Sequence, residues 1–228
     1  MVSAPGSRAI VGVDMRGRSY VAPRRGPWAV IKRAIDLVGS AVLLVLLSPL
    51  FAVLALATVL DSGRPVLFRQ VRLARGLREF RVLKFRTMKL GASSEMHEDY
   101  IKKLATGQAD EDSLKKLAAD PRVTRVGGFL RKTSLDELPQ LVNVFLGNMS
   151  LVGPRPALEY ELQYYKDEHY DRFAVKPGMT GLWQVSGRNE LGFIEMLDLD
   201  ADYARTGGLL TDIKILVKTP MAAISKAA

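Results

Sequence analysis

The chain has 228 residues, no cysteine and a formal net charge of +9 at pH 7. This length fits one domain with a small appendage. The absence of cysteine excludes disulfide bonds, a thiolate zinc site and a thiol nucleophile. Residues 1–35 hold seven Arg or Lys against one acidic residue, and residues 64–89 hold nine against one. A nucleic-acid-binding protein usually carries its basic stripe on the folded domain. Here the basic stretches flank an apolar segment, which favours anionic lipid headgroups as partners and no nucleic acid.

Residues 1–26 are rich in Gly, Ser, Pro and Arg, which predicts a flexible basic tail. A secretory signal is not expected, because the apolar segment begins late and no small-residue cleavage site follows it. Residues 27–62 form the next predicted unit, and Pro27 and Trp28 suit a helix start at a membrane interface. Residues 63–228 are expected to form a compact domain.

Residues 37–60 form a run of 24 residues without a charge. Such a run can cross a hydrocarbon core of roughly 30 Å, and hydropathy alone favours one spanning helix. Two features favour instead a re-entrant hairpin that enters and leaves by the same leaflet. Ser48-Pro49 interrupts the run at its middle, and each half then reaches only about 16 Å. Both flanks are also strongly basic, so the positive-inside rule assigns neither of them to the outer side.

Two strands are predicted at residues 66–70 and 79–84, joined by a turn. Lys84 and Arg86 follow near the membrane exit, where they can bind lipid headgroups. Neither a GxxxxGK[ST] nor a GxGxxG motif occurs, so P-loop and dinucleotide-binding functions lose their main support.

The second half of the chain alternates helical and turn-rich segments. Residues 95–119 predict two helices, and residues 157–173 predict one polar helix rich in tyrosine. The two histidines, His97 and His169, lie in these polar helical contexts. We expect both to be solvated, without a metal or catalytic role.

A turn-rich region with a short strand at 182–186 precedes a loop that contains Arg188. Helices are predicted over residues 193–205 and 209–224. Apolar residues recur at helical spacing in the last of these, which either faces the core or lies in a membrane interface.

Two adjacent carboxylates, Asp136 and Glu137, lie between Arg131 and Arg155. Adjacent carboxylates repel each other. A divalent cation with flanking arginines would let both stay ionised, and that combination suits phosphate chemistry. The alternative is structural, because Ser134 followed three residues later by Glu137 also fits a capping box at a helix start. Taken alone, these residues favour the capping box.

Arg155 stands between two prolines in Gly153-Pro154-Arg155-Pro156. The prolines fix the backbone, so little order remains to be lost when the arginine binds a phosphate through two hydrogen bonds. The alternative is a plain turn with a solvated arginine.

Three motifs in this order resemble those of the bacterial sugar transferases, the monotopic phosphoglycosyl transferases of cell-surface glycan assembly. They are Lys84-Phe85-Arg86-Thr87-Met88, LRKTSLDELPQLVNVFLGNMSLVGPRP at 130–156, and KPGMTGLWQVSGRN at 176–189. The nearest likeness is to the short members that initiate exopolysaccharides. With the apolar segment, the resemblance covers nearly everything from about residue 30 onwards.

The resemblance implies a mainly α fold with a short β-hairpin (α+β). A re-entrant helix hairpin hinged at Ser48-Pro49 would carry a compact cytoplasmic catalytic domain with interfacial amphipathic helices. The protein would lie on the cytoplasmic face of the bacterial inner membrane. The implied reaction moves a hexose-1-phosphate from a UDP-sugar to polyprenyl (undecaprenyl) phosphate and releases UMP, with galactose or glucose as the sugar.

The resemblance also implies roles for single residues. Asp136 would be the nucleophile that forms a phosphosugar intermediate, and Glu137 would assist it as a partner in binding Mg²⁺. The implied phosphate-binding residues are Arg131, Arg155, Lys84, Arg86 and Arg188. The residues that recognise the uridine and the sugar are left open, as is homo-oligomerisation.

Two other classes of function remain as alternatives. A non-catalytic membrane-anchored scaffold that binds anionic lipids would explain the charge distribution and the apolar segment, but not the ordered motifs. A metal-dependent hydrolase of a lipid diphosphate would use the same carboxylates and arginines. Incubation with a labelled UDP-sugar and polyprenyl phosphate separates the three. The transferase moves the label into the organic phase, the hydrolase releases free sugar phosphate, and the scaffold does neither.

Overall fold

The computed structural model describes residues 10–13, 19–21, 27–92, 95–108, 120–187 and 191–225. This part of the chain is mostly helical with three two-stranded sheets, which confirms the predicted α+β class. Its α-helices are α1 (Pro27–Leu46), α2 (Ser48–Ser62), α3 (Glu95–Ala105), α5 (Arg125–Thr133), α6 (Gln140–Leu146), α7 (Phe193–Thr206) and α8 (Leu209–Ser225). Its 3-10 helices are η1 (Arg75–Leu77), η2 (Leu135–Glu137), η3 (Glu159–Tyr164), η4 (Asp167–Ala174) and η5 (Trp183–Val185).

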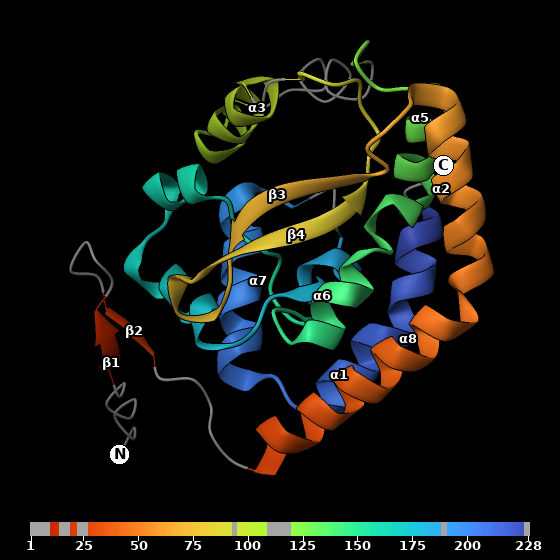
Figure 1. Ribbon diagram of the computed structural model, residues 1–228. Coiled ribbons are helices and arrows are strands. Elements are labelled where there is room, and N and C mark those ends of the chain that lie inside the picture. Colours follow the sequence, from red (N-terminus) through yellow and green to blue (C-terminus); the bar gives the residue numbers. More distant parts are fainter. Residues whose placement is uncertain are drawn as a thin grey trace, which may run out of the picture.

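The central ribbon pairs β3 (Leu67–Leu73) with β4 (Glu79–Phe85) in antiparallel register, and α6 and α7 lie behind it (Figure 1). Apolar side chains on one face of β4 are buried, among them Phe80 and Val82. These two side chains pack in one cluster with Val144 of α6 and the buried Met149. The alternation of buried and exposed positions follows from the two-residue period of a strand. The predicted hairpin is confirmed, with a first strand that extends further than expected.

The helix break predicted at Ser48-Pro49 is confirmed, because α1 ends at Leu46 and α2 begins at Ser48 with the proline in its first turn. The two helices form a bent rod along the outside of the molecule, and α8 runs beside α1 (Figure 1). Within the described residues no single helix is long and apolar enough to cross a membrane. The α1–α2 pair, bent by 63°, meets that test only when both helices are taken together.

One face of α1 attaches the bent rod to the rest of the domain through polar side chains. The two guanidinium nitrogens Nη1 and Nη2 of Arg33 donate to the last carbonyl groups of α6, at 2.7 and 2.8 Å. The buried carboxylate of Asp36 accepts from Ser150 Oγ and from the backbone N–H of Leu151, both at 2.9 Å. Lys32 forms an ion pair with Asp212 of α8. Three side chains from one stretch of α1 therefore hold three different elements.

The structure contains a parallel pair of strands that the sequence analysis misses. It joins β5 (Ser150–Val152) to β6 (Gly178–Thr180). The strand predicted at 182–186 is wrong, since residues 183–185 form η5 instead. The backbones approach closely here because both neighbours are glycines: a Cβ on Gly178 would lie 2.1 Å from the nitrogen of Gly153.

Two further expectations differ from the structure. The single helix predicted for residues 157–173 is replaced by η3 and η4, and most of η4 is buried. Within residues 1–26, the described residues form the antiparallel strands β1 (Ile10–Val13) and β2 (Ser19–Val21), where β-branched and aromatic residues favour extended backbone. The second helix predicted within 95–119 lies outside the described residues.

The expectation that both histidines are solvated is wrong. His169 is fully buried, and its ring hydrogen bonds are made inside the protein. His97 is half-buried and its Nδ1 lies 2.6 Å from the hydroxyl of Tyr160. The sequence did not reveal this, because the neighbours of both histidines are polar, and polarity alone does not show that Asp171 and Arg172 are buried together with His169.

Candidate active site

The adjacent carboxylates lie in a tight turn between two helices. Helix α5 ends at Thr133, and Ser134 adopts the left-handed conformation at φ 58° that commonly terminates a helix. The 3-10 helix η2 follows at once and carries Asp136, which is only 8% exposed, and Glu137. The side chain of Ser134 makes no capping hydrogen bond. The capping-box interpretation is therefore wrong.

A cavity of about 240 Å³ opens beside this turn, between the β3–β4 ribbon, the Gly153–Pro156 turn and the segment around η5. Three cationic side chains line it, and Glu137 is the carboxylate among its lining residues. The residues that carry the argument below are Arg72, Lys84, Glu137, Arg155, Trp183 and Gln184. Concave sites with a few convergent polar groups are the usual form of a ligand pocket.

Lys84 connects the ribbon to the turn that carries the carboxylates. Its Nζ lies 3.0 Å from Glu137 Oε1, and both side chains are partly exposed in the cavity. Glu137 therefore turns toward the cavity rather than back onto the helix end.

Arg155 is held on three sides. Its Nη1 donates to Glu161 Oε1 at 3.1 Å, and Glu161 is itself almost fully buried. Its backbone N–H donates to Asp200 Oδ2, and its carbonyl accepts from Arg172 Nη2 at 2.6 Å. Arg172 and Asp200 form a buried ion pair with each other. The predicted rigid arginine is thus present, and its rigidity comes from this network as well as from the two prolines.

The charged groups around Arg155 influence one another's pKa values, and all of them stay ionised near neutral pH. Burial would raise the pKa of Glu161, but the positive charges of Arg155 and Arg72 outweigh burial, so this pKa is lowered and the carboxylate stays ionised. Burial and the charge of Arg155 lower the pKa of Arg72 to about 10, which still leaves Arg72 protonated near neutral pH. The cavity therefore keeps a concentrated positive charge suited to an anionic ligand.

Arg131 lies on the other side of the carboxylate turn. Its Nε donates to Thr87 Oγ1 at 2.8 Å. Burial lowers the pKa of Arg131, and the charge of Asp136 opposes this shift. Arg131 is not among the residues that line the cavity.

Arg86 has a different position from that expected of a phosphate-binding residue in the cavity. Its Nη2 donates to the carbonyls of Ser62 and Gly63 at 2.7 and 2.6 Å, and so closes the C-terminal end of α2. Its Nε and Nη1 are buried and have no hydrogen-bond partner among the residues that the structure describes. Arg188 lies outside the described residues.

The sequence analysis missed two contributors to the cavity. Arg72 is one of several arginines in a basic stretch, and nothing in the sequence singles out the one whose side chain turns inward. Gln184 was noted only as part of a motif, yet it lines the cavity. The signal that could have found it is its place in the motif at residues 176–189, which also contains Arg188, an implied phosphate-binding residue.

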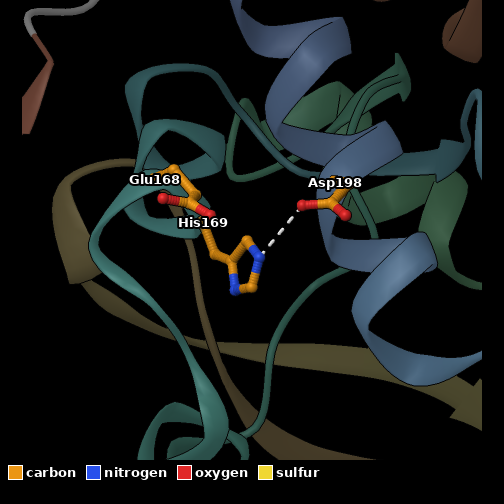
Figure 2. Close-up of side chains that lie close together, drawn as sticks. All are labelled: Glu168, His169 and Asp198. Carbon is orange, nitrogen blue, oxygen red and sulfur yellow. Dashed lines mark hydrogen bonds and ion pairs between the residues drawn. The ribbon is translucent and has the colours of Figure 1, made fainter.

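A second group of possible metal ligands is Glu168, His169 and Asp198, whose ligand atoms lie within 4.8 Å of one another (Figure 2). His169 Nδ1 accepts the backbone N–H of Lys166 at 3.0 Å. The ring proton is therefore on Nε2, which lies 3.1 Å from Asp198 Oδ1 and donates to it. A metal would need a lone pair at that nitrogen. The group is a hydrogen-bonded link between η4 and α7.

A cavity lined by three cationic side chains lies beside the turn that carries the buried Asp136 and the partly exposed Glu137, and such a cavity suits an anionic ligand. The chain belongs to the bacterial sugar transferase family, whose model matches residues 28–226.

Three relatives illustrate this membership. The UDP-galactose-lipid carrier transferase of Erwinia amylovora is 46% identical over 189 residues, which are 83% of this chain and 39% of the relative. The exopolysaccharide production protein ExoY of Rhizobium meliloti is 38% identical over 196 residues, 86% of each chain. The UDP-glucose:undecaprenyl-phosphate glucose-1-phosphate transferase of Escherichia coli is 40% identical over 208 residues, 88% of this chain and 41% of the relative. The chain thus spans well under half of some relatives and most of another.

Proposed function

We propose that the protein transfers a hexose-1-phosphate from a UDP-sugar to undecaprenyl phosphate and releases UMP, as the first membrane step of exopolysaccharide synthesis. The observation that carries this proposal is the cavity lined by Arg72, Lys84, Arg155 and Glu137, with Asp136 as the residue before Glu137 in η2. Three cations suit a diphosphate, and an adjacent carboxylate supplies a nucleophile. The printed names of the relatives, which refer to galactose and to glucose 1-phosphate, support a hexose of this kind.

The chemistry divides into two displacements at phosphorus. A carboxylate oxygen of Asp136 forms a bond to the phosphorus that bears the sugar, and the bond from that phosphorus to the bridging oxygen breaks, so UMP leaves with the electron pair. A phosphate oxygen of the polyprenyl acceptor then attacks the same phosphorus, and the bond to Asp136 breaks. The products are a polyprenyl diphosphate sugar and the regenerated carboxylate. Splitting one difficult transfer into two steps is the usual advantage of a covalent intermediate.

Arginine and lysine side chains would stabilise the charge that develops on the phosphoryl oxygens. Arg155 is suited to this role because its network leaves it little freedom to lose on binding. Lys84 lies next to Glu137 and can move its contact from the carboxylate to a phosphate oxygen. Preorganised charges of this kind contribute strongly to catalysis in a partly enclosed site.

A magnesium ion fits the residues present at the turn. Mg²⁺ is commonly bound through one or two carboxylates together with substrate phosphates and water. Asp136 and Glu137 are adjacent, and the buried position of Asp136 would favour a cation that offsets its charge. When bound, the ion would neutralise the diphosphate and orient its leaving group.

We further propose that α1 and α2 enter the cytoplasmic leaflet of the bacterial inner membrane and return to the same side. The exposed apolar side chains along both helices support this, among them Val38, Val45, Leu56 and Leu60. The basic flanks on both sides of the helix pair would bind anionic headgroups. A re-entrant arrangement holds the site at the interface, where a soluble nucleotide sugar and a lipid phosphate can meet.

The test uses the full chain in lipid nanodiscs with undecaprenyl phosphate and a UDP-hexose that carries a ³²P label on the phosphate next to the sugar. Transfer of the label into the organic phase, dependent on the lipid acceptor, is the expected result for UDP-galactose or UDP-glucose. Release of free labelled sugar phosphate would support a hydrolase instead. No turnover, with retained binding to anionic vesicles, would support a scaffold.

A further inference from the structure

The cavity contains a buried polar group that the fold leaves without a partner. Gln184 is 9% exposed and lines the cavity. Its Oε1 is enclosed and accepts no hydrogen bond from any residue within the described ranges. A buried amide oxygen without a donor destabilises the folded state, whereas an apolar side chain of the same size would not. Gln184 therefore does not serve stability, and a ligand is the natural source of the missing donor.

The backbone around Gln184 places its amide close to the turn that carries Arg155. A Cβ on Gly181 would lie 2.6 Å from Gln184 Oε1 and 2.3 Å from the carbonyl oxygen of Gly153. Only glycine leaves room for this approach. Gly153 begins the turn in which Arg155 lies. Backbone hydrogen bonds join this turn to the segment that precedes Gln184.

The other lining residues limit the chemistry of the ligand. Arg72, Lys84 and Arg155 require an anion, and a phosphate or diphosphate fits them best. Trp183, half-buried beside Gln184, offers an aromatic surface on which a planar group can stack. A nucleotide combines a phosphate, a planar base and a hydrogen-bonding edge.

Uracil matches the amide. Its N3–H donor stands next to a carbonyl acceptor, and the side-chain amide of glutamine offers an acceptor next to a donor. We propose that Gln184 binds the uracil of the nucleotide substrate: Oε1 accepts the N3–H, Nε2 donates to an adjacent carbonyl, and Trp183 lies against the base. This inference rests on the proposed function and names the residues that recognise its soluble substrate.

The test compares ligands that lack either one hydrogen-bond donor or the whole base. The full chain in nanodiscs is titrated with UMP, with 3-methyl-UMP, which lacks the N3–H, and with ribose 5-phosphate, which lacks the base. The wild-type protein should bind UMP about tenfold or more tightly than 3-methyl-UMP, the range expected for loss of a paired contact to a base. Gln184→Met should weaken UMP binding by a similar factor, remove the preference against the methylated ligand and leave ribose 5-phosphate unaffected. Gln163→Met is the matched control, because Gln163 is exposed on η3 outside the cavity, and it should change neither affinity.

A second readout separates binding from folding. Because Gln184→Met removes an unsatisfied polar atom, the Tm of the ligand-free variant should equal or exceed that of the wild type. Equal wild-type affinity for UMP and 3-methyl-UMP would overturn the inference, and this comparison needs no variant to fold. A parallel loss of ribose 5-phosphate binding in Gln184→Met would assign the amide to the ribose and overturn it as well. The transfer assay is independent: absent transfer with an intact UMP preference would refute the reaction but keep the uracil site.

Discussion

Lys84 of β4 and Glu137 of η2 form an ion pair at 3.0 Å, although 53 residues separate them in the chain. The pair ties the β3–β4 ribbon to the turn that carries both carboxylates. It also places a mobile ammonium group within reach of whatever anion occupies the cavity. Lys84 thus belongs to the candidate active site rather than only to the basic surface near the membrane.

Replacing Lys84 by Gln should reduce hexose-1-phosphate transfer at least tenfold, because the positive charge beside the phosphates is lost. The free energy of unfolding should change by less than about 1 kcal/mol, since partly exposed ion pairs contribute little to stability. Transfer rates and thermal unfolding of the same preparations measure the two effects. Lys89→Gln removes one exposed positive charge from the same stretch and serves as the control. Equal losses in both variants would attribute the effect to general surface charge.

Asp136→Asn should abolish transfer, because the amide keeps the shape of the side chain but is a poor nucleophile. Wild-type protein mixed with UDP-sugar in the absence of the lipid acceptor and then acid-quenched should carry a hexose-phosphate mass on the peptide that contains Asp136. Glu137→Gln should retain this adduct at a reduced rate and require more Mg²⁺, if Glu137 contributes to binding the ion. Normal turnover in Asp136→Asn would refute the assignment of the nucleophile.

Arg155→Lys should lower kcat/KM for the UDP-sugar by about ten- to a hundredfold, because lysine cannot reproduce two parallel hydrogen bonds to a phosphate. Membrane association should not change. The matched control is Arg78→Lys, an exposed position at the end of the ribbon turn. If Arg155→Lys turns over at the wild-type rate, the Gly153–Pro156 turn is only structural.

The contribution of His97 to stability should be lost between pH 6.5 and about 4. Burial, together with the charges of Arg155 and Arg72, lowers the pKa of His97 to about 4 in the folded state. The unfolded chain binds a proton near the ordinary value of about 6.5, so the contribution of His97 is complete above that pH. It is lost progressively as the pH falls toward the folded-state value. Thermal unfolding should show His97→Gln to be less sensitive than the wild type over this range. An identical pH profile for the two proteins would contradict the role of His97.

Membrane topology can be read by labelling because the wild-type chain has no cysteine. Single cysteines at Ser7, in the N-terminal segment, and at the exposed Thr106 at the end of α3 should both resist an impermeant reagent added to intact cells. Replacing Ser48-Pro49 by Ala-Leu should straighten the helix pair, so that position 7 becomes labelled while position 106 does not. Labelling of position 7 in the parent chain would establish a spanning helix.

Local signals in the sequence account for the parts of the fold that were predicted correctly. The β3–β4 ribbon follows from alternating residues, and the break between α1 and α2 follows from one proline at the centre of an apolar run. The β5–β6 pair carries no such signal. It forms because Gly153 and Gly178, far apart in the chain, allow the backbones to meet.

The candidate site was predicted less completely than the fold. The motif around Asp136 and Glu137 indicates where the carboxylates lie, but a capping box has the same residues, and only the backbone conformation of Ser134 decides between them. The inward turn of Arg72 and the burial of Gln184 depend on tertiary packing. Sequence patterns describe faces of elements and do not report which one of several arginines turns inward.

The contacts of α1 have a practical consequence for producing the domain. Removing residues 27–62 to obtain a soluble fragment would leave the last carbonyls of α6 without Arg33 and the buried Ser150 hydroxyl without Asp36. It would also expose the apolar side chains of Phe85 and Leu130 to solvent, because both pack against Leu54 of α2. The α1–α2 pair is therefore part of the tertiary structure of the domain, and crystallisation or screening should retain it in detergent or nanodiscs.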